Sequence, residues 1–171
     1  LTTAIKMTGE EIFKHIDYYP ESLHRGLEVI TETTLRFMNE LIAAGVDGVF
    51  FATQLATHDR MTSKDYDIFG RKYDVAILEA LQGKTWFNIL HLHGLEPMMD
   101  ELLNYPVEAL SWHDRKVACN LKDARQKTDK VLVGGLDEHG ILHTSTPDEL
   151  RAHIQDAIQQ SGSNRIILGP G

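Results

Sequence analysis

The chain has 171 residues, of which 42% are hydrophobic and 25% are charged, values typical of one soluble globular domain. This composition excludes disordered and fibrous proteins, and no apolar run approaches the roughly 18 residues that cross a bilayer. The formal charge of −8, from 17 Lys and Arg against 25 Asp and Glu, argues against a nucleic-acid surface. We therefore expect residues 1–171 to belong to one domain.

A few sequence features bear on the cellular compartment and on the natural start of the chain. Cys119 is the single cysteine and has no partner for an internal disulfide, so we expect a reducing, cytoplasmic environment. The basic cluster around Arg115 is interrupted by Asp114 and Asp123, which predicts a solvated helix face. The chain starts without Met and without a signal pattern, which suggests that its natural start lies elsewhere.

The first half of the chain alternates helical and strand patterns. Apolar residues recur at helical spacing over Leu23–Ile42, and Gly45 is placed to end that helix. The apolar run Val46–Thr53 predicts a strand that is buried on both faces. A second helix is predicted over Tyr66–Leu81, closed by Gly83.

The same alternation continues to the end of the chain. The predicted strands are Trp86–His91, Val107–Trp112, Lys130–Gly134 and Arg165–Leu168. The predicted helices are a short one opened by Pro97, one from about Arg115 to Thr128, and one from Thr146 to Gly162. The last of these begins with a capping box, Thr146-Pro147-Asp148-Glu149.

Five strands separated by helices predict βαβ units and a parallel sheet. No strand is followed by a G-x-G-x-x-G fingerprint, and Gly134-Gly135-Leu136-Asp137 has no helix directly behind it, so a dinucleotide site is not expected. A doubly wound sheet is one alternative, but the regular units favour about five βα units of a (β/α)8 barrel. A complete barrel has eight strands and about 250 residues. The open edges of a partial barrel then require further strands, a second copy of the chain, or both.

Reactive side chains gather after the predicted strands, where parallel α/β folds place their sites. Of the nine histidines, five lie in or just beyond strand ends, together with several carboxylates: His58, His91, His93, His113 and His139, with Asp59, Asp114, Asp137 and Glu138. The alternative explanation is that such loops are polar and carry histidine by chance.

His91 and His93 form the sharpest local pattern. Residues i and i+2 of a strand point to the same face with Cα atoms about 6.5 Å apart, so both imidazoles could reach one ion. Two neutral histidines and a third ligand would make a zinc site with an open position. The alternative is a pair of imidazoles that hydrogen-bond substrate or carboxylates without metal.

The other candidates have both a functional and a structural interpretation. Trp112 either packs at the barrel rim or stacks on a flat ligand, while His113 and Asp114 are candidates for acid/base chemistry or for supporting a metal ligand. Asp137 either binds a cationic or NH-bearing ligand or caps a turn. Cys119, in a helical pattern, is interpreted as a buried small residue. No G-x-S-x-G elbow supports a hydrolase triad.

In this order and spacing, the chain resembles the uroporphyrinogen decarboxylase family of (β/α) barrels from about Tyr18 to its end. The resemblance is carried by Ala44-Gly45-Val46-Asp47-Gly48, His91-Leu92-His93-Gly94, Leu110-Ser111-Trp112, Gly134-Gly135-Leu136-Asp137 and Leu168-Gly169-Pro170-Gly171. It implies one of two activities. One branch decarboxylates a tetrapyrrole without a cofactor, and the other transfers a methyl group from a corrinoid to a thiol with zinc held by a His-x-Cys pair and a later Cys.

The chain departs from both branches. Gln54 stands where the decarboxylase branch has a serine, and Pro170 stands where that branch has a histidine between glycines. His91 matches the histidine of the methyltransferase branch, while His93 replaces its cysteine with another residue able to bind zinc. The later cysteine is expected directly after Gly171, and the catalytic aspartate of the family upstream of this chain.

Three hypotheses follow from the resemblance. The favoured one is a zinc-dependent methyltransferase, with His91 and His93 as ligands. The second is a cofactor-free carboxy-lyase that binds a tetrapyrrole, and the third is a non-catalytic binding or assembly module. We assign catalysis to His113, Asp114 and Asp137, and substrate binding to Gln54, Trp112 and Gly135. The expected partners are a tetrapyrrole or corrinoid-linked substrate and a second copy or the rest of the barrel, without nucleic acid or membrane.

Overall fold

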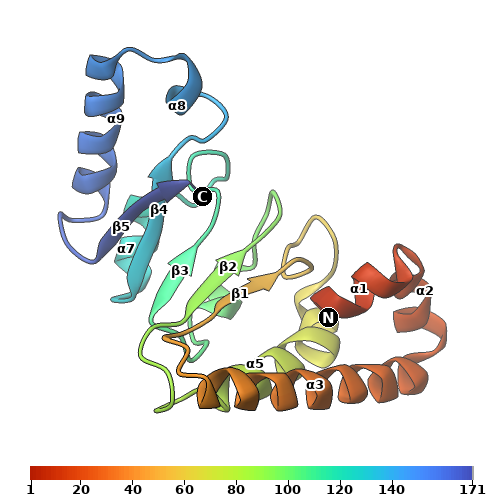
Figure 1. Cartoon of the computed structure of the whole chain (residues 1–171). Helices are drawn as coiled ribbons and strands as arrows, with labels where there is room; N and C mark the ends of the chain where they lie inside the picture. The colour runs from red at the N-terminus through yellow and green to blue at the C-terminus, as the bar shows by residue number, and fades with distance from the viewer. Residues whose placement is uncertain (171) are drawn as a thin grey trace.

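A computed structural model describes residues 1–170, which form one parallel sheet with helices before and between its strands (Figure 1). The strands are β1 Phe50–Thr53, β2 Ile89–Leu92, β3 Ala109–Ser111, β4 Val131–Leu136 and β5 Ile166–Pro170. The helices are α1 Thr2–Thr8, α2 Glu11–Tyr18, α3 Pro20–Ala43, α4 Ser63–Tyr66, the π-helical turn η1 Asp67–Arg71, α5 Lys72–Glu79, α6 Met99–Leu102, α7 Leu121–Lys127, α8 Ile141–Thr144 and α9 Pro147–Gln160.

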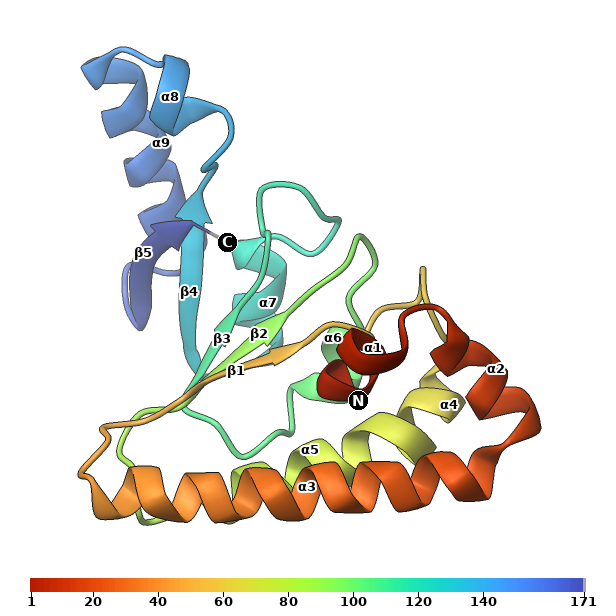
Figure 2. The ribbon, with the colours of Figure 1, turned by 45° about the vertical axis from the view of Figure 1, so that its right-hand side comes forward.

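The strand order decides between the two predicted architectures. The strands lie side by side in chain order, β1 to β5, and each neighbouring pair is parallel. A doubly wound sheet reverses its direction at a switch point, whereas a (β/α) barrel adds every strand on the same side. Figure 2 shows α3 and α5 along β1 at one end of the sheet and α9 beside β5 at the other. The partial barrel is confirmed, and the doubly wound alternative is wrong.

The first strand is less buried than predicted. Phe50 at its start is 60% exposed, and only Thr53 in this strand is buried. β1 pairs with β2 alone among the described residues, so one of its edges has no strand beside it. The expectation of a strand buried on both faces is therefore wrong, because the apolar run does not show which strand forms an edge.

Two predicted helices differ in their details. The helix predicted over Tyr66–Leu81 is interrupted by η1, where a Cβ on Gly70 would lie 2.3 Å from the Tyr66 ring. The helix predicted from Arg115 begins only at Leu121, because Asn120 accepts a hydrogen bond from the Asp123 backbone N–H and caps it.

Residues before that cap form a loop. Arg115 therefore does not stand on a solvated helix face: its guanidinium donates to the Gly135 carbonyl at 3.0 Å and to Asp156 at 2.6 Å. Cys119 is partly buried in the same loop rather than in a helix.

Two helices that sequence periodicity did not reveal precede the long helix α3. α1 lies against the end of β1, because the Thr2 hydroxyl donates to the Ala52 carbonyl at 3.0 Å and accepts from the Gln54 N–H at 3.1 Å. Ala4 and Ile12 bury one face of α1 and α2. This placement brings the side of α1 next to the carboxyl end of β1, where the candidate site lies.

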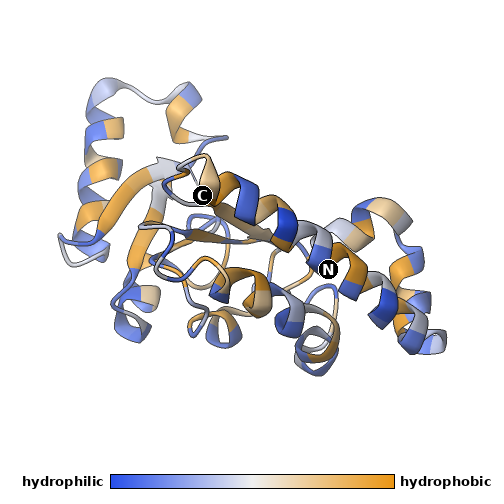
Figure 3. Cartoon of the chain, turned by 60° about the horizontal axis from the view of Figure 1, so that its bottom comes forward, coloured by the Kyte–Doolittle hydropathy of each residue, from blue (hydrophilic) through white to orange (hydrophobic). Residues whose placement is uncertain are grey.

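The core lies between the sheet and its covering helices. Figure 3 shows hydrophobic residues along β4 and β5 and alternating hydrophobic and hydrophilic stretches on α3 and α9. Leu90, Leu110 and Leu132 stand at the centre of β2, β3 and β4 and have no exposed surface, and Leu90 and Leu132 both neighbour Leu110 in register. Within residues 1–170, no helix has the length and apolarity that crossing a membrane requires.

The capping box at the start of α9 is formed as predicted. The Thr146 hydroxyl accepts from the Glu149 N–H at 3.4 Å, and the Glu149 carboxylate accepts from the Thr146 N–H at 2.7 Å. We expect Thr146→Ala to lower the free energy of unfolding by about 1 kcal/mol, because the Glu149 N–H in the first turn of the helix loses its hydrogen-bond acceptor. Urea denaturation followed by circular dichroism tests this, with the exposed Thr33→Ala as control. An equal loss in both variants would contradict a specific capping effect.

Candidate functional site

Three histidine rings converge at the carboxyl ends of β2 and β3. The centroids of His91 and His93 are 6.2 Å apart, and His113 lies 5.8 Å from His91 and 6.1 Å from His93. The convergence follows from topology: β2 and β3 are parallel neighbours, with His91 opposite Ser111. His91 and His93 thus lie together as the i, i+2 spacing predicts, and His113 joins them from the next strand.

Two contacts hold the His91 ring in place. Its Nδ1 lies 3.2 Å from the Ser111 hydroxyl, and its ring stacks on Phe50 at 5.2 Å between centroids. Burial, followed by the nearby His113 and His93 rings, lowers the pKa of His91 to about 4. The imidazole of His91 is therefore neutral at neutral pH.

A cavity of about 510 Å³ opens beside these rings. It is lined by residues from the ends of β1, β2 and β3 and from α1, among them Ile5, Gln54, Asp59, Arg60, His93 and His113. A larger apolar cavity of about 660 Å³ lies along α1 and α3, but none of the three histidines lines it. The cavity at the strand ends is therefore the candidate site, and it contains the predicted residue Gln54.

Hydrogen bonds join the loop after β1 to the loop after β2, next to His93. Asp59 accepts hydrogen bonds from the Leu95 and Glu96 backbone N–H groups, both at 3.2 Å. Thr57 also donates to Asp59, and this bond is the main cause of the lowered pKa of Asp59. Gly94 has a φ of +102°, and a Cβ there would lie 2.2 Å from the Thr57 hydroxyl oxygen. This packing fixes the chain directly after His93.

Asp114 is turned toward β4. Its side chain is 1% exposed, and one carboxylate oxygen accepts from the Gly135 N–H at 2.8 Å. Burial is the main cause of the raised pKa of Asp114. A Cβ on Gly134 would approach the same carboxylate to 2.5 Å, which explains the glycine there. The contacts of Asp114 thus join the end of β3 to β4.

Gly135 is closely packed against helix α9. It is buried and has a φ of +93°, and a Cβ there would lie 2.6 Å from the Ala157 methyl group of α9. The close approach of helix α9 explains why a glycine stands here, and the assignment of Gly135 to substrate binding stays a prediction.

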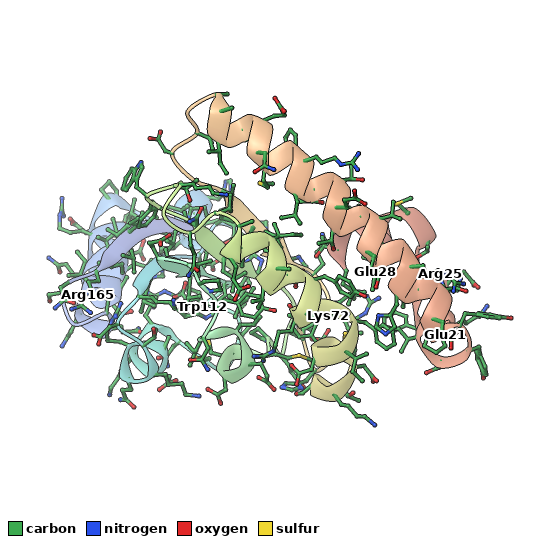
Figure 4. All side chains as sticks on the ribbon, turned by 90° about the horizontal axis from the view of Figure 1, so that it is seen from below. Glu21, Arg25, Glu28, Lys72, Trp112 and Arg165 are labelled. Atoms are coloured by element: carbon green, nitrogen blue, oxygen red, sulfur yellow. The ribbon has the colours of Figure 1, made fainter. Side chains whose placement is uncertain are left out.

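Trp112 is also a core residue. It has no exposed surface, and its indole N–H donates to the Cys119 carbonyl at 2.8 Å. Figure 4 shows Trp112 in the interior, in contrast to Arg165 at the periphery. The absence of exposed surface favours packing over stacking on a ligand, and the assignment of Trp112 to substrate binding stays a prediction.

The loop after β4 supplies two carboxylates with different partners. Asp137 accepts from the His139 backbone N–H at 3.1 Å, the turn cap that was one of its two interpretations. Glu138 Oε1 lies 3.5 Å from His113 Nδ1 and 2.8 Å from Lys116 Nζ. Glu138 is the carboxylate that faces the histidine cluster, although sequence analysis assigned it no role. Its position after a strand was the available signal.

The histidine pair supplies the donor atoms that a metal site would use. Neutral imidazole nitrogens are common zinc ligands, and the His91 and His93 rings lie 6.2 Å apart between centroids. Among residues 1–170, however, no group of three or more His, Cys, Asp and Glu side chains has an arrangement that could hold a metal ion. The described residues therefore fit two ligands of such a site.

Comparisons with known proteins agree with the partial-barrel fold. The family model described as uroporphyrinogen decarboxylase (URO-D) matches residues 1–171. A uroporphyrinogen decarboxylase from Christiangramia forsetii is 28% identical over 156 residues, covering 89% of this chain and 43% of the relative. One from Hydrogenovibrio crunogenus is 26% identical over 151 residues, covering 84% and 40%.

A solved methyltransferase from Methanosarcina mazei shares the fold. Its TM-score is 0.76 at 19% sequence identity, and the match covers 93% of this chain and 46% of that protein. The chain thus spans less than half the length of each of these relatives.

Proposed function

The chain belongs to the uroporphyrinogen decarboxylase family, and on that premise we propose that it forms part of an enzyme that transfers a methyl group from a corrinoid to a thiol. The observation that carries the proposal is the pair of imidazoles, His91 and His93, whose rings lie 6.2 Å apart at the end of β2. This is where the methyltransferase branch holds zinc. The relatives that the chain matches are named as enzymes of one branch or the other.

The residues divide the work of such a site. His91 and His93 would hold zinc, and we propose that the next ligand is the cysteine expected after Gly171, because residues 1–170 contain no ready set of three ligands. When bound, zinc would lower the pKa of a thiol so that its thiolate forms at neutral pH. Gln54 and His113 line the cavity where the thiol-bearing substrate would bind, and Asp114 and Asp137 position the loops around it.

Zinc content is the decisive measurement. In the natural protein with any flanking sequence included, we expect about one zinc ion per chain. The double variant His91→Ala, His93→Ala is expected to lose it, because two imidazole donors disappear. The matched control His139→Ala, His143→Ala removes two exposed histidines, one from the loop after β4 and one from α8, and should keep the metal. A folded wild type without zinc, or zinc retained in the first double variant, would contradict the proposal.

Cofactor-free decarboxylation of a tetrapyrrole is the second candidate. It is favoured by the names of the two curated relatives, which are 28% and 26% identical to the chain. Spectroscopic titration with a porphyrinogen analogue and with a corrinoid separates the two activities. Binding of the corrinoid alone supports methyl transfer, binding of the porphyrinogen alone supports decarboxylation, and binding of neither in a folded protein supports a non-catalytic module.

Location and assembly are also proposals. The single, partly buried Cys119 suits a reducing cytoplasm. The sheet has open edges at β1 and β5 among the described residues, and we propose that a second copy or the remaining strands of the family barrel pair with them.

A further inference from the structure

One nitrogen of His113 is buried without a hydrogen bond among the described residues. Nδ1 has almost no solvent-accessible surface and no partner that meets hydrogen-bond geometry. The carboxylate nearest to ideal contact is Glu138, whose Oε1 lies 3.5 Å away. A buried imidazole N–H that lacks a partner costs free energy, so a small movement that closes this distance is favourable.

The surroundings of Glu138 keep it available as an acceptor. Lys116 Nζ lies 2.8 Å and His139 Nε2 3.3 Å from the same oxygen. The hydrogen bond from Lys116 is the main cause of the lowered pKa of Glu138, so its carboxylate stays ionised. A carboxylate oxygen has two lone pairs and accepts from more than one donor.

The other carboxylates near the cluster have their contacts elsewhere, and the second Asp114 oxygen, Oδ2, is buried without a hydrogen bond to residues 1–170, 3.6 Å from Arg115 Nε. Asp114 accepts from the Gly135 N–H at 2.8 Å, and Asp137 accepts from the His139 N–H at 3.1 Å. Neither of these contacts faces His113. Of the carboxylates at the ends of β3 and β4, only Glu138 forms a described ion pair with this ring.

We propose that Glu138 is a positioning residue that holds the proton of His113 on Nδ1 and leaves Nε2 as a base facing the cavity. The two nitrogens of an imidazole point to different sides of the ring, and the hydrogen bond made by one nitrogen determines the tautomer. His113 lines the cavity beside His93. Nε2 is therefore placed to act on a substrate bound there.

The inference deepens the proposed function, on which it rests for the identity of the proton donor. The thiol S–H proton of the acceptor substrate moves to His113 Nε2, the sulfur keeps the electron pair, and His113 becomes an imidazolium. Its Nδ1–H then faces the ionised Glu138, which stabilises the new positive charge.

The test reads the tautomer directly. ¹⁵N NMR of histidine side chains in the natural protein at pH 8 distinguishes Nδ1–H from Nε2–H, with His113→Gln identifying the signal. We expect His113 to be mainly Nδ1–H in the wild type and to move toward Nε2–H in Glu138→Met, which removes the acceptor at similar length. Lys116→Met, which removes a different partner of Glu138, should keep Nδ1–H, and so should the exposed control Glu40→Met.

Kinetics and metal content separate this inference from the proposed function. With corrinoid and thiol, Glu138→Met should lower kcat about 10- to 100-fold with little change in KM or zinc content. An unchanged tautomer in Glu138→Met, or an equal shift in Lys116→Met, would overturn the inference even in a zinc-loaded, active protein. Absence of zinc from the folded wild type would overturn the proposed function while leaving the Glu138–His113 pairing to be judged by NMR alone.

Discussion

Replacing Trp112 by alanine is expected to lower the free energy of unfolding by about 3–5 kcal/mol. The indole has no exposed surface and donates a hydrogen bond to the Cys119 carbonyl. The substitution therefore leaves a large cavity and removes the hydrogen bond to the Cys119 carbonyl. Since small domains have a total stability of about 5–15 kcal/mol, the variant should unfold at a much lower urea concentration. Urea denaturation followed by circular dichroism measures the loss.

Trp86 provides a matched control, because the chain has two tryptophans. Trp86 is 70% exposed and donates to the Asp47 carboxylate at 2.9 Å. Trp86→Ala should cost about 1 kcal/mol or less, as surface substitutions do. A similar loss in the two variants would show that Trp112 is not buried as described. A larger effect of Trp112→Ala on ligand binding than on stability would support the stacking role.

Sequence periodicity was sufficient to predict the parallel sheet and most of its helices. The predicted strand Lys130–Gly134 and the capping box at Thr146 depend on neighbouring residues, and both are found. The edge position of β1 was not predictable, because Val46–Thr53 has the same apolar composition as a central strand. The π-helical turn at Asp67–Arg71 was not predicted either, because the apolar spacing of this segment is the same as that of a continuous α-helix.

In the candidate site, too, local strand geometry was predictable and loop conformation was not. The i, i+2 spacing brings His91 and His93 together because strand geometry is local. Which carboxylate serves His113 is decided by loop conformations: Asp114 is adjacent in sequence but accepts from Gly135, whereas Glu138 comes from the next strand end. The burial of Trp112 was not predictable for the same reason, since the sequence around it is equally compatible with a place at the barrel rim and a place in the core.

The stability of the protein is expected to fall by roughly 2 kcal/mol between pH 6.5 and pH 4 because of His91 alone. Folding lowers the pKa of His91 from 6.5 to about 4, mainly through burial. Above pH 6.5 the ring is neutral in both the folded and the unfolded state, so its titration causes no loss of stability there. Below this pH the unfolded chain binds a proton that the folded chain rejects, so stability is lost until about pH 4. This loss of stability is smaller than the full pKa shift of His91 would give, because the ring is only partly buried and solvent screens its charge.

The comparison with His91→Gln isolates this effect from other titrations. Burial raises the pKa of Asp114 and of Asp74, and these groups change stability in the opposite direction as the pH falls. They are present in both proteins and cancel in the difference. Urea denaturation at intervals from pH 7.5 to pH 4 should therefore give a shallower acid loss in His91→Gln than in the wild type. Parallel curves would mean that His91 binds its proton equally in both states, and hence that the histidine cluster is not closed as the structure describes.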